Sequence, residues 1–230
     1  GTSVHSPFAA FLTSGIVIII VLSGVAVTFI VSFILSKTLL KGAPSTFNLE
    51  LPPYRKPQIG KVIIRSIFDR TLFVLGRAIG IALPAGAITW LVANITIGNA
   101  SILNHISDFL DPFGRAIGLD GIILLAFILG LPANEIVLPI VFMSYLSKGA
   151  MIELNGIEEM RNIFVSNGWT WLTCLNVMLF SLFHFPCGTT LWTIKKETQS
   201  LKWTIAAFII PTLVAIVVCF STTRIAHWFH

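Results

Sequence analysis

Long apolar runs separated by short polar segments dominate the chain, and they predict five membrane segments. The runs cover residues 15–36, 78–97, 121–147, 169–194 and 203–223. As helices rising about 1.5 Å per residue, they are long enough to cross a hydrocarbon layer of about 30 Å. A polar linker, residues 37–77, joins the first two runs. We therefore expect an all-α polytopic transmembrane helical bundle, with residues 1–230 forming a single transmembrane domain.

The third run carries a carboxylate near its middle, with two prolines close by. Glu135 is the sole formal charge of residues 121–147, and a carboxylate at that depth usually faces a protein interior or a water-filled path. Pro132 and Pro139 lack amide donors and disfavour helix in the residue before them. The pattern predicts a discontinuous or re-entrant helix, broken near residues 130–135, with Glu135 close to the positive end of a restarted half-helix. The alternative is a Pro-kinked helix whose glutamate is protonated or hydrogen-bonded to a neighbouring helix.

The fourth run repeats this design near residues 186–188. A helix restarting at Pro186 places Cys187 at a helix N-terminus, where the dipole favours the metal-binding thiolate. His184 offers an imidazole as a further ligand. The alternatives are a small core cysteine and a hydrogen-bonded core histidine. The residues expected to shape the two helix breaks are Pro132, Pro139, Pro186 and Gly188.

Composition assigns the chain to the membrane. Hydrophobic residues make up 55% of the sequence and charged residues 11%, and the mean hydropathy is +0.89, which excludes an ordinary soluble domain. The net charge of +5 lies mostly beside apolar runs, so it indicates membrane orientation rather than nucleic-acid binding. The basic excess of residues 37–77 predicts a cytoplasmic linker. Residues 59–70 and 98–119 have the apolar periodicity of interfacial amphipathic helices.

Several classes of site are absent from the sequence. Cys174, Cys187 and Cys219 lie within apolar runs and form no C-x-x-C pair, which excludes a disulfide framework and a zinc knuckle. Neither H-E-x-x-H nor G-x-S-x-G occurs, so an intramembrane enzyme is not expected. The chain starts without Met and without a cleavable signal peptide, and we expect it to be a piece of a longer protein.

The side of the membrane on which the C-terminus lies stays open. Five simple crossings starting outside would put the basic residues 195–202 outside, against the positive-inside rule. A re-entrant hairpin at the third run would return these residues to the cytoplasm, and the C-terminus would then lie outside.

Three groups of motifs resemble one family. They are Glu50-Leu51-Pro52-Pro53-Tyr54-Arg55, Gly130-Leu131-Pro132-Ala133-Asn134-Glu135-Ile136-Val137, and Phe185-Pro186-Cys187 followed by Lys195-Lys196-Glu197-Thr198 and Lys202-Trp203. In order and spacing they resemble the C-terminal membrane region of ferrous iron transport protein B, the FeoB family. The resemblance implies a multi-pass protein of the bacterial inner (plasma) membrane that contains the second of two gate regions related to nucleoside-transporter gates. Fe(II) would be the transported ion, with no permanently bound cofactor.

The resemblance also implies site residues and partners. Glu135 and Cys187 match the acidic and cysteine positions of the second gate region, with Asn134 and His184 as neighbours, so these four are the candidate metal ligands. The chain lacks the G-x-x-x-x-G-K-[ST] phosphate loop, and it therefore has no evident means of binding GTP. The implied partners are the lipid bilayer, the N-terminal G domain and first gate region of the same transporter, and small cytoplasmic regulators of iron transport.

Two other functions remain open. A gate-type carrier for nucleosides or other organic solutes would use Asn134, Glu135 and Thr189 for hydrogen bonds, and it would tolerate Cys187→Ser. A non-transporting membrane scaffold or regulator would use the broken helices for packing, and it predicts no substrate flux.

Overall fold

The computed structural model describes residues 7–38, 59–65, 68, 71–98, 100–146 and 156–228. It divides into two units, Gly1–Arg65 and Ser66–His230, and each is described by itself. The motif at residues 50–55 and most of the predicted linker 37–77 lie outside the described residues.

The first unit contains a long apolar helix, α1 (Pro7–Thr38), and a short helix, α2 (Ile59–Arg65). Phe11–Thr38 is a candidate membrane span with a mean hydropathy of 2.9. The hydroxyl groups of α1 do not interrupt its apolar character, because they donate to backbone carbonyls of the preceding turn. Ser23 Oγ, for example, donates to the Ile20 carbonyl at 2.7 Å, and Thr28 Oγ1 donates to the Gly24 carbonyl at 2.8 Å.

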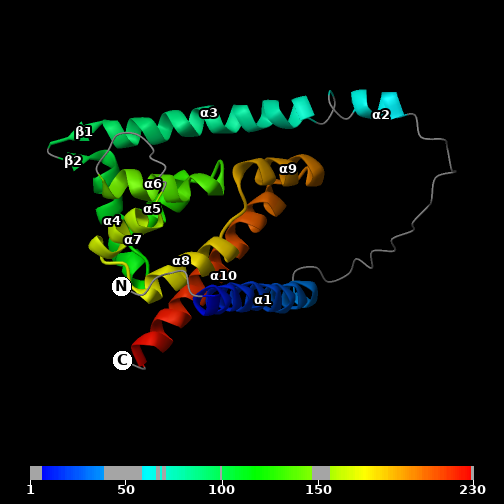
Figure 1. The fold of residues 1–230 in the computed structure, drawn as a ribbon. Helices are drawn as coiled ribbons and strands as arrows, with labels where there is room; N and C mark the ends of the chain where they lie inside the picture. Colours follow the sequence, from blue (N-terminus) through cyan, green and yellow to red (C-terminus); the bar gives the residue numbers. More distant parts are fainter. Residues whose placement is uncertain are drawn as a thin grey trace. The chain divides into compact units, whose positions relative to one another are not determined.

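The second unit is built around three apolar segments. They are α3 (Phe73–Asn94), the pair α8 (Trp171–Phe183) and α9 (Gly188–Thr198), and α10 (Leu201–Trp228). α10 packs against both α8 and α9, and α9 also contacts α3 (Figure 1). Together with α1, the described residues contain four helices long and apolar enough to cross a membrane. The predicted all-α, polytopic membrane fold is therefore confirmed.

A short connection follows α3 and turns the chain into an amphipathic helix. Strands β1 (Thr96–Ile97) and β2 (Ala100–Ser101) form a two-stranded antiparallel ladder. Helix α4 (Ile102–Ala116) begins at Ser101, whose side chain accepts a hydrogen bond from the Asn104 amide, and it lies within the amphipathic stretch predicted over residues 98–119. The chain then bends by 110° into α5 (Gly121–Leu129).

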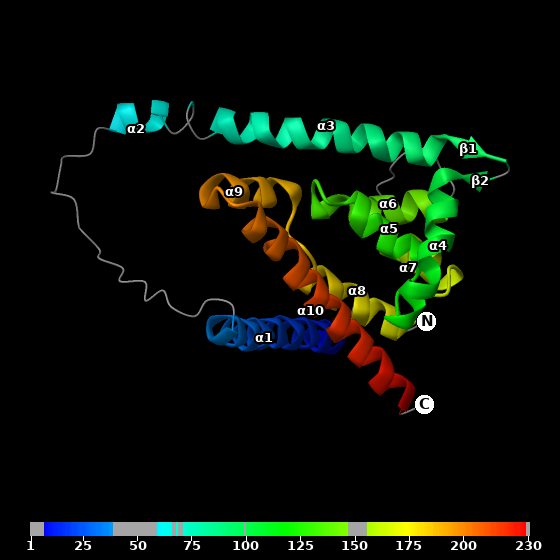
Figure 2. The ribbon, with the colours of Figure 1, turned by 180° about the vertical axis from the view of Figure 1, so that it is seen from behind.

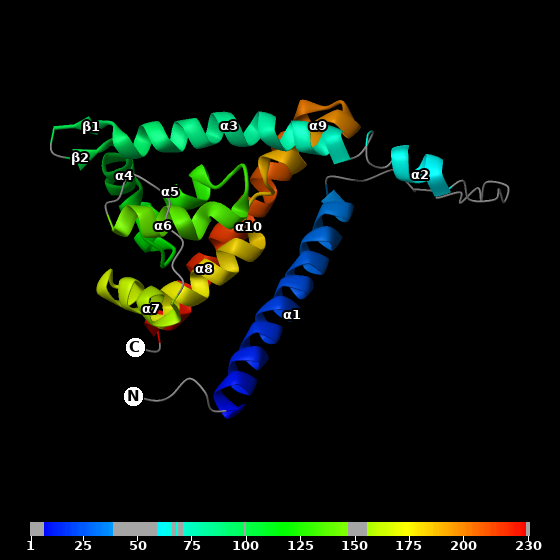
Figure 3. The same cartoon turned by 45° about the horizontal axis from the view of Figure 1, so that its top comes forward.

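The next two helices form a hairpin. α5 and α6 (Val137–Tyr145) are joined by the 3₁₀ turn η2 (Asn134–Ile136). They lie side by side in all three ribbon views, with the connection at one end (Figures 1, 2 and 3). Each has nine residues, about 13 Å of helix, which is too short to cross a bilayer alone. The apolar core of the unit lies here, including the fully buried Ile123, Ala126, Ile140 and Val141.

The open end of the hairpin is held by a chain of polar contacts. Asp120 caps α5 by accepting a hydrogen bond from the Ile123 amide at 2.6 Å. Its other carboxylate oxygen accepts from the Tyr145 hydroxyl at the end of α6. The same hydroxyl accepts from Trp169 Nε1 at 2.7 Å, and the Trp169 ring stacks on Phe164 of α7 (Ile157–Ser166). One carboxylate thus ties the start of α5, the end of α6 and the segment following α7 together.

A second polar cluster lies between α8 and α10. Asn176 is fully buried, and its amide nitrogen donates to the Ile117 carbonyl at 3.1 Å and to Thr223 Oγ1 at 2.9 Å. Its amide oxygen accepts from Thr222 Oγ1 at 2.6 Å. Gly118 has φ of +71° and lies directly against Asn176 and Thr223, so a side chain there would collide with both. The cluster fixes the α4–α5 corner against the two helices.

Candidate functional site: two helix breaks that meet

The first break, residues 130–133, forms the tip of the α5–α6 hairpin. The Ala133 amide donates to the Gly130 carbonyl at 3.0 Å, and the Ile136 amide donates to the Ala133 carbonyl at 3.1 Å. Pro132 lies in the turn before η2. Pro139 lies in the first turn of α6, where its missing amide breaks no helical hydrogen bond. The break therefore precedes Pro139.

The second break, residues 184–187, separates α8 from α9. The His184 amide donates to the Phe180 carbonyl at 2.8 Å and ends α8. Cys187 has extended backbone angles and is the N-cap of α9, with Pro186 just before it. The Cys187 carbonyl accepts from the amides of Thr190 and Leu191. Cys187 therefore stands at a helix N-terminus, in the positive part of the helix dipole.

The two breaks meet through a backbone hydrogen bond. The Gly188 amide, the first of α9, donates to the Leu131 carbonyl in the hairpin tip at 2.7 Å. The first amides of a helix lack partners within the helix, and here the hairpin supplies one. A Cβ atom at Gly188 would lie 3.3 Å from Ile81 Cγ2 of α3 and 3.6 Å from the Leu131 oxygen. Close approach of three segments thus explains a glycine at this position.

Cys187 is half-buried at this junction and is surrounded by hydroxyl groups. Its sulfur lies 3.1 Å from Thr189 Oγ1 and 3.1 Å from Thr190 Oγ1. Hydroxyl donors and a helix N-terminus both stabilise a thiolate. The Cys187 sulfur therefore lies beside the hairpin tip, within hydrogen-bonding distance of two hydroxyl groups.

Glu135 and Asn134 are exposed on η2, at the tip of the hairpin. Within the described part of the chain, neither side chain makes a hydrogen bond or ion pair. Leu131, four residues before Glu135, is the residue bonded to Gly188. The α5–α6 connection therefore carries both an unpaired carboxylate and the carbonyl that contacts the start of α9.

His184 lies away from solvent in an aromatic cluster. Its Nδ1 lies 3.0 Å from the Ser181 carbonyl, and its ring centroid is 5.0 Å from those of Phe127 and Phe185. Its Nε2 is buried and has no hydrogen-bond partner in the described structure. The imidazole is thus packed among aromatic rings, as expected of a core histidine.

A complete metal site is not formed within the described residues. No group of three or more His, Cys, Asp or Glu side chains there is placed to hold a metal ion. The carbonyls of Gly130, Leu131 and Ala133 already accept backbone hydrogen bonds. The assignment of Glu135, Cys187, Asn134 and His184 as ligands therefore remains a prediction.

Sequence reasoning missed the polar contacts that hold this junction in place. Asn176 is the clearest case: an asparagine inside an apolar run signals a buried partner, although it does not identify one. Asp120 gave a second signal, as an N-cap residue directly before an apolar helix.

Comparison with known proteins places this sequence in a family. Residues 17–69 match the sequence model of the ferrous iron transport protein B C terminus, and residues 75–201 match the model described as nucleoside recognition, the gate domain. The chain belongs to the ferrous iron transport protein B family. It corresponds to the C-terminal membrane region of FeoB, so the resemblance noted in the sequence is confirmed. This region is a multi-pass membrane protein segment.

Relatives extend the match over most of the chain. It is 30% identical over 217 residues to the Fe(2+) transporter FeoB of Staphylococcus aureus (strain MSSA476), covering 90% of this chain and 31% of the relative. It is 27% identical over 212 residues to the Fe(2+) transporter FeoB of Leptospira biflexa, covering 86% and 31%. The chain thus spans about a third of the length of these relatives. No solved structure matches it.

Proposed function

We propose that this chain forms part of the Fe(II) permeation path and gate of a FeoB transporter. The observation that carries the proposal is the hydrogen bond between the Gly188 amide and the Leu131 carbonyl, because it joins the two Pro-containing breaks of the gate domain. Broken helices that present ligands from opposed termini are the usual ion sites of membrane transporters.

Each of the two ligands has a distinct task in this proposal. Glu135 supplies negative charge and an oxygen ligand from the hairpin tip, and Cys187 supplies a soft sulfur ligand from the start of α9. Fe(II) accepts both donor types, whereas Mg(II) and Ca(II) favour oxygen alone. A site with so few fixed ligands would bind Fe(II) weakly enough to release it, as conduction requires. Asn134 would assist from the same turn.

The hairpin supports one of the two orientations that the sequence left open. If the α5–α6 hairpin enters and leaves the membrane on one side, it adds no crossing to the topology. The turn between α9 and α10 then lies at the same end of the second unit as the start of α3 (Figures 1 and 2). Lys195, Lys196 and Lys202 lie at this end, and Arg77 of α3 reaches it by donating to Thr193 Oγ1 of α9. By the positive-inside rule this end faces the cytoplasm, which places the C-terminus outside. In a bacterium the membrane would be the inner (plasma) membrane.

The source of regulation would lie in the remainder of the transporter. The relatives are about three times as long as the matched region, which leaves room for the G domain and first gate region. A nucleotide-driven movement reaching the cytoplasmic end could separate or join the two breaks, and small cytoplasmic regulators would act at the same end.

Anaerobic Fe(II) uptake into proteoliposomes holding the full-length transporter tests this function. Glu135→Gln and Cys187→Ala should each reduce uptake at least tenfold while the protein still inserts. Matched controls are Glu159→Gln on α7 and Cys174→Ala on α8, both exposed and remote from the breaks. Equal losses in controls and test variants, or near-normal uptake by Glu135→Gln, would overturn the proposal.

The same vesicles distinguish an iron transporter from an organic-solute carrier. The second function is favoured by the description of the matching family, nucleoside recognition. Uptake of radiolabelled uridine that survives Cys187→Ser, without any Fe(II) uptake, would identify that activity. No flux of either solute with a correctly inserted protein would indicate a scaffold.

A further inference from the structure

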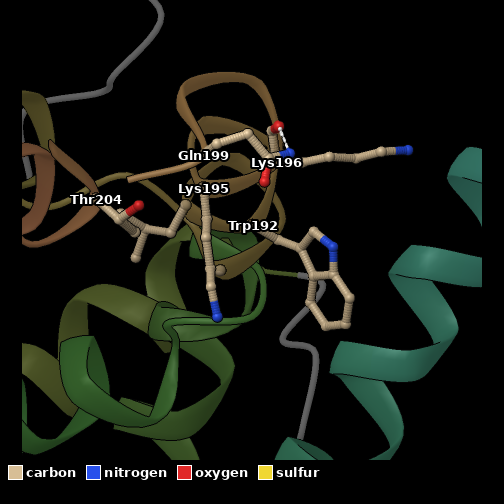
Figure 4. Close-up of a pocket in the computed structure, with 7 residues that line it drawn as sticks. Trp192, Lys195, Lys196, Gln199 and Thr204 are labelled. Carbon is tan, nitrogen blue, oxygen red and sulfur yellow. Dashed lines mark hydrogen bonds between the residues drawn. The ribbon is translucent and has the colours of Figure 1, made fainter. Parts of the chain in front are cut away.

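A pocket of about 490 Å³ lies at the turn between α9 and α10, in the range typical of small-ligand sites. Its lining residues are Gly188, Leu191, Trp192, Lys195, Lys196, Gln199 and Thr204. Figure 4 shows the Lys195 and Lys196 side chains pointing in different directions, with the Trp192 indole between them. The pocket combines cationic groups with an apolar wall.

The pocket lies at the level of a membrane boundary. The candidate spans Trp171–Thr198 and Leu201–Trp228 are separated by two residues, so the turn must lie at a membrane boundary. Trp192 and the neighbouring Trp203 are exposed, and tryptophan and lysine are typical of this interfacial level. The open side of the pocket therefore faces the headgroup region of the bilayer.

The charge of the pocket indicates an anionic ligand. The polar groups of Gln199 and Thr204 are engaged internally: Gln199 Nε2 donates to the Lys196 carbonyl at 2.7 Å and Thr204 Oγ1 donates to the Ser200 carbonyl at 3.0 Å. Within the described chain, no carboxylate forms an ion pair with Lys195. The Lys195 ammonium thus supplies positive charge to this pocket, and it recognises negative charge.

We propose that this pocket binds the headgroup of an anionic phospholipid. The phosphate would lie by the ammonium of Lys195, and the glycerol and first methylenes would pack on Leu191 and Trp192. A soluble phosphate would gain nothing from that apolar wall. Basic pockets between membrane helices on the cytoplasmic side are known to take such headgroups. The inference stands whichever solute the gate passes.

The pocket is also joined to the gate. Gly188 lines it, and the amide of the same residue holds the Leu131 carbonyl of the hairpin tip. A lipid bound here would therefore stabilise the start of α9 in the position where the two breaks meet.

Native mass spectrometry of the delipidated full-length protein in detergent tests the site. Phosphatidylglycerol should be retained more than phosphatidylcholine, and Lys195→Gln should weaken phosphatidylglycerol retention roughly fivefold. Lys202→Gln removes a charge at the same end but outside the pocket, and it should leave specific retention within about twofold of the wild type. Equal loss in Lys202→Gln, or equal retention of both lipids, would overturn the proposal.

Two further measurements locate the bound lipid and identify the ligand. Brominated phosphatidylglycerol should quench a fluorescence component that Trp192→Phe removes, and Lys195→Gln should weaken this quenching. Inorganic phosphate at 10-fold excess should not displace the lipid. Displacement by phosphate would show that the pocket takes a free anion, and unchanged quenching in the lysine variant would show that the lipid lies elsewhere.

Discussion

The Gly188 amide donates to the Leu131 carbonyl at 2.7 Å, and this bond joins the first turn of α9 to the tip of the α5–α6 hairpin. The two residues belong to different apolar runs, each interrupted by a proline. Their contact converts two local helix breaks into one junction, with Cys187 on one side and the exposed Glu135 on the other. A change at this bond should therefore affect both candidate ligands together.

Gly188→Pro should disconnect the two breaks while preserving α9. Proline suits the first position of a helix, and the extended conformation of Cys187 (φ −60°, ψ 158°) is compatible with a following proline. The substitution removes the amide hydrogen and places the ring against the Leu131 oxygen. We expect at least a tenfold loss of Fe(II) uptake and faster labelling of Cys187 by a membrane-permeant maleimide in a Cys174→Ala, Cys219→Ala background.

Gly188→Ala is the matched control, because it keeps the amide donor. Its added methyl would lie 3.3 Å from a side-chain methyl of Ile81, which a small adjustment can relieve. Uptake should fall less than threefold. If alanine is as damaging as proline, the space at Gly188 rather than the hydrogen bond governs the junction.

Tyr145→Phe should loosen the open end of the hairpin. The hydroxyl donates to Asp120 and accepts from Trp169, so its removal deprives two groups of partners. We expect the free energy of unfolding to fall by about 1–3 kcal/mol, and hydrogen exchange to rise in α7. Ser144→Ala is the control, since the Ser144 hydroxyl bonds only the Ile140 carbonyl within α6. Equal unfolding transitions for both variants would show that the contacts of the Tyr145 hydroxyl with Asp120 and Trp169 contribute no stability.

Asn176→Ala should weaken the packing of α8 on α10. Three side-chain hydrogen bonds would be lost, to Ile117, Thr222 and Thr223. At about 1 kcal/mol per inter-helix bond, a loss of about 2–3 kcal/mol is expected in thermal unfolding. Ser221→Ala, on the exposed side of α10, should be neutral. A variant as stable as the wild type would mean that the cluster only fills space.

Much of this architecture could be predicted from sequence, for physical reasons. A long apolar run has few options other than a membrane helix, because lipid leaves backbone groups no external partners. Helix breaks follow from proline, which lacks the amide donor. Thus the all-α membrane fold was predictable, as was the interruption of helix before residues 134 and 188.

The pairing of distant segments was not predictable in the same way. A crossing helix and a hairpin have the same hydropathy, so the return of α6 along α5 depends on contacts such as Asp120 with Tyr145, which no periodicity indicates. The Leu131 carbonyl is a backbone group, and it carries no sequence signal at all. Asn176 was detectable as polar, but its partners lie on two distant segments, the α4–α5 corner and α10.

His184→Phe separates a core role from a ligand role for this residue. The ring lies among Phe127, Phe180 and Phe185, with Nε2 buried and partnerless in the described structure. Phenylalanine has a similar shape and removes the unsatisfied nitrogen, whose burial costs about 1–3 kcal/mol. We expect a variant at least as stable as the wild type in thermal unfolding, with Fe(II) uptake within about twofold of it. His184→Ala, which leaves a cavity among the rings, should instead lose about 2–4 kcal/mol of stability. A stable, well-inserted His184→Phe protein without uptake would contradict the core assignment, because the imidazole would then have to reach the ion through a rearrangement of the aromatic cluster.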